Sequence, residues 1–158
     1  MKVKTGDNLP SAQVFFLDNS NLVQKKDIRD FTVSGKTIIF GLPGAFTSVC
    51  SVKHLPGFVK SYESALKKGI QNILCLSVND PFVMRAWGEK NNVGNKIMML
   101  GDPFCEFTKL MGLETDKSAK GLGIRSSRYT MLVDNGKIEK ISVEKDTGNC
   151  EISAAENF

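Results

Sequence analysis

The amino-acid sequence predicts an α/β protein with a central mixed, mostly parallel sheet flanked by helices and ending in an antiparallel hairpin. Three short apolar runs alternate with segments of helical periodicity, an order typical of parallel strands joined by crossover helices. Later in the chain, two strand-like segments flank Asp134-Asn135-Gly136, which is a strong hairpin signal. A length of 158 residues with 41% hydrophobic side chains suits one domain over residues 1–158.

The predicted strands are short segments bounded by turn signals. Residues 37–40 form a continuous β-branched and apolar run, which is typical of a buried central strand. This run ends at Gly41-Leu42-Pro43-Gly44, a strong breaker of regular structure. The other predicted strands cover residues 13–17, 73–78, 97–100, 129–133 and 137–143.

The predicted helices alternate with these strands. Apolar residues at helical spacing and the terminal Lys67-Lys68-Gly69 predict a helix that ends near residue 68, with a kink or restart at Pro56. Asn79-Asp80-Pro81 supplies an N-cap and a first-turn proline for a helix over residues 81–90. A short helix is expected at 106–111, and Ser153-x-x-Glu156 resembles a capping box before a last helical turn.

Charge and hydropathy exclude several classes of function. The net charge is +4, but the 21 Lys and Arg residues are scattered, which favours a solvated basic surface over a nucleic-acid interface. No apolar run approaches the ~20 residues that a membrane-spanning helix needs. The first ten residues lack the apolar core of a secretory signal, so we expect an intracellular protein, cytoplasmic or, if a targeting segment has been removed, organellar.

The four cysteines are widely spaced. Cys50, Cys75, Cys105 and Cys150 form no C-x-x-C pair, which argues against a zinc ribbon, against any metal site of that type and against a thioredoxin-type dithiol. We therefore expect thiols that are reduced at rest, as in an intracellular protein.

Cys50 is the first candidate for chemistry. It follows the 41–47 turn and is expected in the first turn of a helix, where N–H groups and the positive helix end favour thiolate over thiol. Thr47 offers a hydroxyl to a bound substrate oxygen, and the ring of Pro43 can shield the sulfur from water. From this placement alone, the alternative is that Cys50 is a small buried core residue.

A nearby cation is also expected, because one helical turn rarely activates a cysteine fully. Arg128 is the first choice and Arg125 the second, since both precede the strand predicted at 129–133. A guanidinium at this place can hold Cys50 as a thiolate and donate to a substrate oxygen.

Three segments of the chain resemble one protein family. Pro43-x-x-x-Thr47-x-x-Cys50 looks like the peroxiredoxin active-site motif, and the stretch GLPGAFTSVCSVKHLPGF resembles the atypical, type II (fifth) subfamily in its plant-like form. The segments SVNDPFVM at 77–84 and GLGIRSSRY at 121–129 resemble the same subfamily. The resemblance implies a thioredoxin-like fold and a thiol-dependent peroxidase that reduces hydrogen peroxide and organic hydroperoxides, with peroxynitrite as a further substrate.

The resemblance also implies roles for matching residues. Cys50 would attack the terminal peroxide oxygen and become a sulfenic acid, which is the first reversible step of cysteine oxidation. Thr47 and Arg128 would position the peroxide, and Pro43 would cover the site. This agrees with the chemistry, because the O–O bond needs donors on both oxygens as charge moves to the leaving one.

The resemblance further sets expectations for substrate contacts and partners. Gly44 and Phe46 are the expected substrate-binding residues, with Phe46 alternatively at a homodimer face. No cofactor or metal is implied; an external thiol, glutathione with glutaredoxin or else thioredoxin, would reduce the sulfenic acid. Cys150 and Cys75 are the possible internal resolving cysteines, although the strand position of Cys75 favours a core residue.

Other classes of function stay open at this point. A non-turnover thiol redox sensor or a chaperone on the same fold would also use an oxidisable Cys50. A thiol–disulfide oxidoreductase is disfavoured by the absence of a C-x-x-C pair. A cysteine hydrolase would need a histidine base, and the single histidine, His54, lies one helical turn after Cys50 and is expected to be structural.

Overall fold

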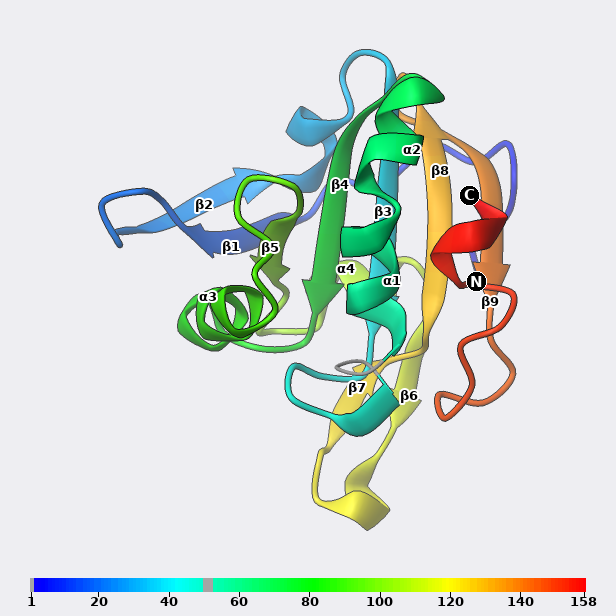
Figure 1. Cartoon of the computed structure of the whole chain (residues 1–158). Helices are drawn as coiled ribbons and strands as arrows, with labels where there is room; N and C mark the ends of the chain where they lie inside the picture. The colour runs from blue at the N-terminus through cyan, green and yellow to red at the C-terminus, as the bar shows by residue number, and fades with distance from the viewer. Residues whose placement is uncertain (1, 50–52) are drawn as a thin grey trace.

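The computed structural model describes residues 2–49 and 53–158. Within these residues, seven strands form the main sheet. In chain order they are β1 (Gln13–Leu17), β2 (Val23–Asp27), β3 (Lys36–Leu42), β4 (Ile70–Ser77), β5 (Met98–Gly101), β8 (Tyr129–Asp134) and β9 (Lys137–Val143). They lie side by side in the order β2-β1-β5-β4-β3-β8-β9, as Figure 1 shows. A separate two-stranded sheet joins β6 (Glu114–Asp116) to β7 (Ile124–Ser126).

The main sheet confirms the predicted mixed architecture. Its centre is parallel, because β3 pairs with β4 and β4 with β5 in the same direction. Antiparallel pairs complete both edges: β8 and β9 on one side, β1 and β2 on the other. The pairing of β3 with β8 sets Gly41 opposite Tyr129, so the residues just before β8 lie beside the carboxyl end of β3.

Helices cover both faces of this sheet, and each face has its own apolar core. The helices are α1 (Leu55–Lys60), α2 (Tyr62–Lys67), α3 (Pro81–Lys90) and α4 (Glu106–Leu110). In Figure 1, α1 and α2 cross in front of β3 and β4, with α4 behind the sheet. On the first face, Phe58 of α1 stacks on Phe40 of β3, and Trp87 of α3 belongs to the same apolar cluster. On the other face, Phe107 of α4 packs with Ile39. No helix of the described ranges combines the length and hydropathy that crossing a bilayer requires.

The first helical region is more broken than its periodicity suggests. Pro56 lies in the first turn of α1, which confirms the predicted restart at that proline. A second break at Ser61 separates α1 from α2 and was not predicted. The predicted end is confirmed, since α2 stops at Lys67 and Gly69 takes a left-handed φ of +87°.

Three strands have no counterpart among the sequence predictions. β2 is mostly exposed and reads VQKKD, so its formation depends on antiparallel pairing with β1 rather than on an apolar face. β6 and β7 have three residues each, too few to show an alternating pattern.

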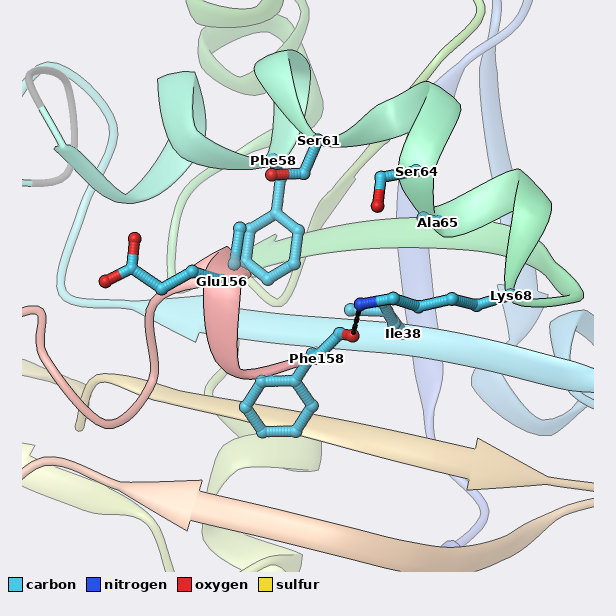
Figure 2. Close-up of a pocket in the computed structure, with 9 residues that line it drawn as sticks. Ile38, Phe58, Ser61, Ser64, Ala65, Lys68, Glu156 and Phe158 are labelled. Atoms are coloured by element: carbon cyan, nitrogen blue, oxygen red, sulfur yellow. Dashed lines mark hydrogen bonds between the residues drawn. The ribbon is translucent and has the colours of Figure 1, made fainter.

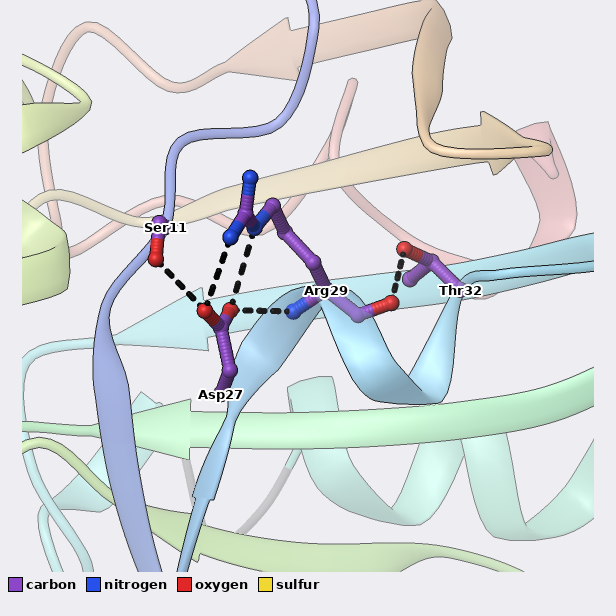
Figure 3. Close-up of polar contacts among 4 residues, drawn as sticks. All are labelled: Ser11, Asp27, Arg29 and Thr32. Atoms are coloured by element: carbon purple, nitrogen blue, oxygen red, sulfur yellow. Dashed lines mark hydrogen bonds and ion pairs between the residues drawn. The ribbon is translucent and has the colours of Figure 1, made fainter.

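The turn after β2 is held by a compact polar cluster. Asp27 caps the 3₁₀ helix η1 (Ile28–Phe31) by accepting from the Arg29 backbone N–H, and it also pairs with the Arg29 guanidinium and the Ser11 hydroxyl (Figure 3). Burial alone would raise the pKa of the Asp27 carboxyl, but the hydrogen bonds from Arg29 and Ser11 outweigh it and lower the pKa to about 2. This cluster links the segment before β1 to the end of β2.

The predicted capping box at Ser153 is wrong. The last 3₁₀ helix, η4 (Ala155–Asn157), begins after Ala154, and no side chain caps it. The Ser153 hydroxyl instead donates to the Glu144 carboxylate at 2.8 Å. A charged acceptor forms a stronger hydrogen bond than a neutral one, which explains the preference.

Candidate active site

The predicted motif loop leaves the carboxyl end of β3, where sites in open α/β sheets usually lie. Pro43 and Gly44 are buried, and Thr47 closes the turn because its hydroxyl donates to the Gly44 carbonyl at 2.7 Å. The Ala45 N–H donates to the Asn79 side chain at 3.0 Å, which ties the loop to the end of β4. Cys50, the predicted nucleophile, lies outside the described residues.

Two further residues shape this loop. Phe46 has a left-handed φ of +65° and a side chain that is 50% exposed, with the Lys90 ammonium 5.7 Å from its ring centre. A Cβ atom at position 44 would lie only 2.6 Å from an Arg125 guanidinium nitrogen, so a side chain there would displace the end of Arg125 from its present position.

Arg128 is buried beside this loop. Its exposed fraction is 1%, and it immediately precedes β8, whose first residue pairs with Gly41. Nε and Nη2 donate to the Thr147 carbonyl at 3.1 and 3.0 Å, and Nη1 lies 3.1 Å from Nδ1 of His54. These contacts fix the plane of the guanidinium and place it against the helical segment that follows the motif.

The contact with Arg128 determines the tautomer of His54. An arginine can only donate, so Nδ1 of His54 must be the acceptor and the proton of the neutral ring lies on Nε2. Nε2 then donates to the Thr130 hydroxyl at 3.1 Å, and Thr130 donates to the Ser153 carbonyl at 2.6 Å. Burial, and then the positive charge of Arg128, lowers the pKa of His54 to about 3. A ring bound in this way on both nitrogens is a poor general base, which argues against a cysteine hydrolase.

Arg125 has a different position although it is only three residues away. It is half-buried, and it donates to the Leu122 carbonyl at 2.8 Å and to the Pro43 carbonyl at 3.1 Å. Arg125 therefore braces the motif loop from the side of β7.

The other cysteines are buried thiols. Cys75 lies on β4 with no exposed surface, and Cys150 has an exposed fraction of 3%. Burial raises the pKa of the Cys150 thiol, an effect that exceeds the opposing hydrogen bond from Ser153 and the charge of Arg128. Over residues 2–49 and 53–158, no group of three His, Cys, Asp or Glu side chains is arranged to hold a metal ion.

A small cavity of about 130 Å³ lies elsewhere, between α1–α2 and η4. Figure 2 shows Phe58 and Ile38 in its wall, with Lys68 donating to the Phe158 carbonyl at 2.7 Å. The residues predicted for the site do not line it, so its chemistry is separate from that of the motif loop.

Sequence reasoning missed the partners of Arg128. Thr147 acts through its backbone carbonyl, which no side-chain pattern reveals. The sequence predicts a structural role for His54 but does not indicate that it contacts Arg128. Nothing in the sequence links Thr130 or Ser153 to Arg128. The single histidine placed four residues after Cys50 was the one available signal.

Known proteins match this chain over nearly its whole length. Residues 4–158 match the redoxin family. Peroxiredoxin-2D of Arabidopsis thaliana is 41% identical over 156 residues, covering 99% of this chain and 96% of that protein. The chloroplastic Peroxiredoxin-2E of the same plant is 42% identical over 146 residues, covering 90% of this chain and 62% of that protein. Reduced Prx3 of Vibrio vulnificus in complex with H₂O₂ has a TM-score of 0.91 and 38% identity, over 98% of this chain and 95% of that one.

Proposed function

The chain belongs to the redoxin family and is a peroxiredoxin, and from this premise we propose that Cys50 is the sulfur with which it reduces peroxides. The protein is a thiol-dependent peroxidase with a thioredoxin-like fold. The observation that carries the assignment of the site is the buried Arg128 guanidinium, 3.1 Å from His54, which follows the motif cysteine by four residues. We propose that residues 1–158 act together as one catalytic domain.

The proposed first step is the reduction of the hydroperoxide by Cys50. The Cys50 thiolate attacks the terminal oxygen of the hydroperoxide, an S–O bond forms and the O–O bond breaks. The other oxygen leaves with a proton as water or an alcohol, and Cys50 becomes a sulfenic acid. Arg128 donates to the peroxide oxygens, and the Thr47 hydroxyl oxygen, whose proton is donated to the Gly44 carbonyl, accepts from the peroxide O–H. Pro43 shields the sulfur, and Gly44 and Phe46 contact the substrate. Vibrio vulnificus Prx3, which has been solved with H₂O₂, supports hydrogen peroxide as one substrate.

The proposed second step uses an external thiol. A thiol attacks the sulfenic sulfur and releases water, and a second thiol then reduces the mixed disulfide. Cys75 and Cys150 are both buried, which supports a one-cysteine cycle because a buried thiol is hard for another sulfur to reach. The raised pKa of the Cys150 thiol further makes it a poor attacking group. We propose glutathione with glutaredoxin as the first reductant and thioredoxin as the second, with no prosthetic cofactor.

Two further proposals concern assembly and compartment. The exposed aromatic side chains of Phe46 and Phe82 support a homodimer formed through the face that carries α3. The widely spaced cysteines and the similarity to a chloroplastic relative support an intracellular site, in the cytoplasm or an organelle.

Mass spectrometry tests the assignment directly. Wild-type protein treated with one equivalent of hydrogen peroxide should gain one oxygen at Cys50, and added glutathione should convert this to a mixed disulfide. Cys50→Ser should abolish turnover, whereas the matched control Cys150→Ser should keep the glutathione-supported cycle. Turnover that persists in Cys50→Ser would identify a different nucleophile, and an internal disulfide to Cys150 would replace the one-cysteine cycle.

A further inference from the structure

Glu144 is a nearly buried carboxylate that follows directly after β9, with an exposed fraction of 9%. One of its oxygens, Oε1, accepts three hydrogen bonds: from the Glu151 N–H at 2.6 Å, the Ser153 N–H at 2.9 Å and the Ser153 hydroxyl at 2.8 Å. Burial would raise the pKa of this carboxyl, but the hydrogen bonds from Ser153 and Glu151 lower it below its usual value. Glu144 is therefore charged at neutral pH, and its hydrogen bonds hold the segment that follows it up to Ser153.

These bonds fold residues 144–153, here named the Glu144 loop, over Arg128. The loop delivers two carbonyl groups to the vicinity of the guanidinium. The Thr147 carbonyl accepts from Nε and Nη2 of Arg128 directly. The Ser153 carbonyl accepts from Thr130, whose hydroxyl in turn accepts from His54.

The hydrogen bonds between Arg128, its neighbours and the Glu144 loop form a closed ring. The backbone N–H of Glu144 donates to the Arg128 carbonyl at 2.9 Å, and Ser153 at the other end of the loop accepts from Thr130 of β8. The hydrogen bonds from Arg128 to His54, from His54 to Thr130 and from Thr130 to the Ser153 carbonyl all run in one direction, because an arginine side chain can only donate. If Ser153 is released, Thr130 loses its acceptor, and the orientation of the His54 ring that meets Arg128 is no longer specified.

We propose that Glu144 is a positioning residue for the peroxidase reaction, which fixes the orientation of Arg128 through the Glu144 loop without touching substrate. This inference rests on the proposed role of Arg128 in binding peroxide. A planar guanidinium that must donate to two oxygens of a small substrate depends strongly on its orientation. Among the described residues, the Thr147 carbonyl accepts from Arg128 within the loop that Glu144 folds, and His54 is oriented through the Ser153 carbonyl of the same loop.

The test uses a double-mutant cycle with a matched control. The variants are Glu144→Ala, Glu144→Gln, Arg128→Ala and the two double variants, each measured by stopped flow for the second-order rate constant with hydrogen peroxide. Glu151→Ala is the control, because it removes the same charge from an exposed side chain of the same loop. Thermal unfolding of each variant reports separately on the fold.

Glu144→Ala should slow the reaction about tenfold to a hundredfold, the range expected for misplaced catalytic groups. Glu144→Gln retains an oxygen acceptor and should lose less, and Glu151→Ala should react as the wild type does. In the Arg128→Ala background, neither substitution at Glu144 should cause a further loss. Because Glu144→Gln keeps the side-chain shape, it provides the cycle if the alanine variant fails to fold.

Three results would overturn the inference, and the measurements distinguish whether the role of Arg128 fails with it. If Arg128→Ala is slow but the Glu144 effects multiply with it, Glu144 acts independently of the arginine and only this inference fails. An unchanged rate in a folded Glu144→Ala or Glu144→Gln variant has the same meaning. If Arg128→Ala itself reacts at the wild-type rate, the proposed catalytic role of the arginine fails as well.

Discussion

Arg125 and Arg128 are the same side chain at two positions three residues apart, yet their surroundings differ. Arg128 is 1% exposed and meets a histidine and a carbonyl of the Glu144 loop. Arg125 is half-buried on the small β6–β7 sheet and contacts only backbone carbonyls, at Leu122 and Pro43, among the hydrogen bonds of the described residues. The difference separates an arginine that is oriented by a histidine and a loop carbonyl from one that supports a loop.

The strand arrangement produces this difference. β7 ends at Ser126, and β8 begins at Tyr129, so Arg128 immediately precedes the main sheet whereas Arg125 belongs to the smaller one. The first residue of β8 pairs with Gly41, two residues before Pro43, and this register brings Arg128 to the carboxyl end of β3. A one-residue change in this register would turn neighbouring side chains to the opposite face.

Removal of the Arg128 side chain should slow the reaction most. Arg128→Ala should lower the rate constant with hydrogen peroxide by roughly a hundredfold to a thousandfold, the range found when a donor to developing oxyanion charge is lost. The Cys50 pKa should also rise, because a nearby positive charge favours the thiolate. Stopped-flow kinetics and titration of the thiolate measure the two effects. Arg128→Lys keeps the charge but lacks the planar guanidinium, so its rate constant should lie between those of the wild type and Arg128→Ala. An unchanged thiolate titration would transfer the role to Arg125.

His54 should make the stability of the protein depend on pH. It contacts Arg128 and is the only histidine in the chain. Its pKa is about 3 in the folded protein against 6.5 as the ordinary value, so the unfolded chain binds the additional proton between these values. Stability is therefore complete above pH 6.5 and falls as pH decreases through this window, by about 2 kcal/mol at pH 5.

Denaturant unfolding at a series of pH values checks this effect. His54→Gln preserves one acceptor and one donor but cannot titrate, so its free energy of unfolding should change less between pH 7 and pH 5 than that of the wild type. Parallel curves for the two proteins would mean that His54 is not held neutral by its buried position. No comparable effect is expected at Arg125, since no histidine contacts it.

Local signals account for the part of the fold that the sequence predicted. The helix at Pro81–Lys90 has the predicted bounds because Asp80 caps it and a proline begins it. The hairpin of β8 and β9 also forms around the predicted turn, with Asn135 and Gly136 at positive φ. β2 was missed because its stability comes from a partner strand and not from its own composition.

One part of the candidate site is predictable from the sequence and another part is not. Its motif loop was located correctly at the end of β3, since a buried strand and a breaker are both visible in the sequence. The network around Arg128 was not predictable, because Glu144 and Ser153 meet His54 and Thr130 only after folding. The sequence reasoning even assigned Ser153 to a helix cap, where the nearby carboxylate proved the stronger partner.

The smallest expected effect is that of removing Arg125. Its hydrogen bond to the Pro43 carbonyl is one of several that hold the motif loop, the others being those of Thr47 to Gly44 and of Ala45 to the Asn79 side chain. Losing one such bond costs about 1 kcal/mol, so Arg125→Ala should slow the reaction with peroxide about fivefold or less. The effect should come with little change in the thiolate titration.

Lys120→Ala is the matched control for this variant, because it removes an equal charge from an exposed position on the turn that joins β6 to β7. If both variants slow the reaction equally and the loss depends on ionic strength, Arg125 contributes through long-range attraction rather than through the Pro43 carbonyl. If Arg125→Ala is as slow as Arg128→Ala, the two arginines act as one unit. The distinction between an arginine oriented for catalysis and an arginine that braces a loop would then no longer hold for this peroxidase.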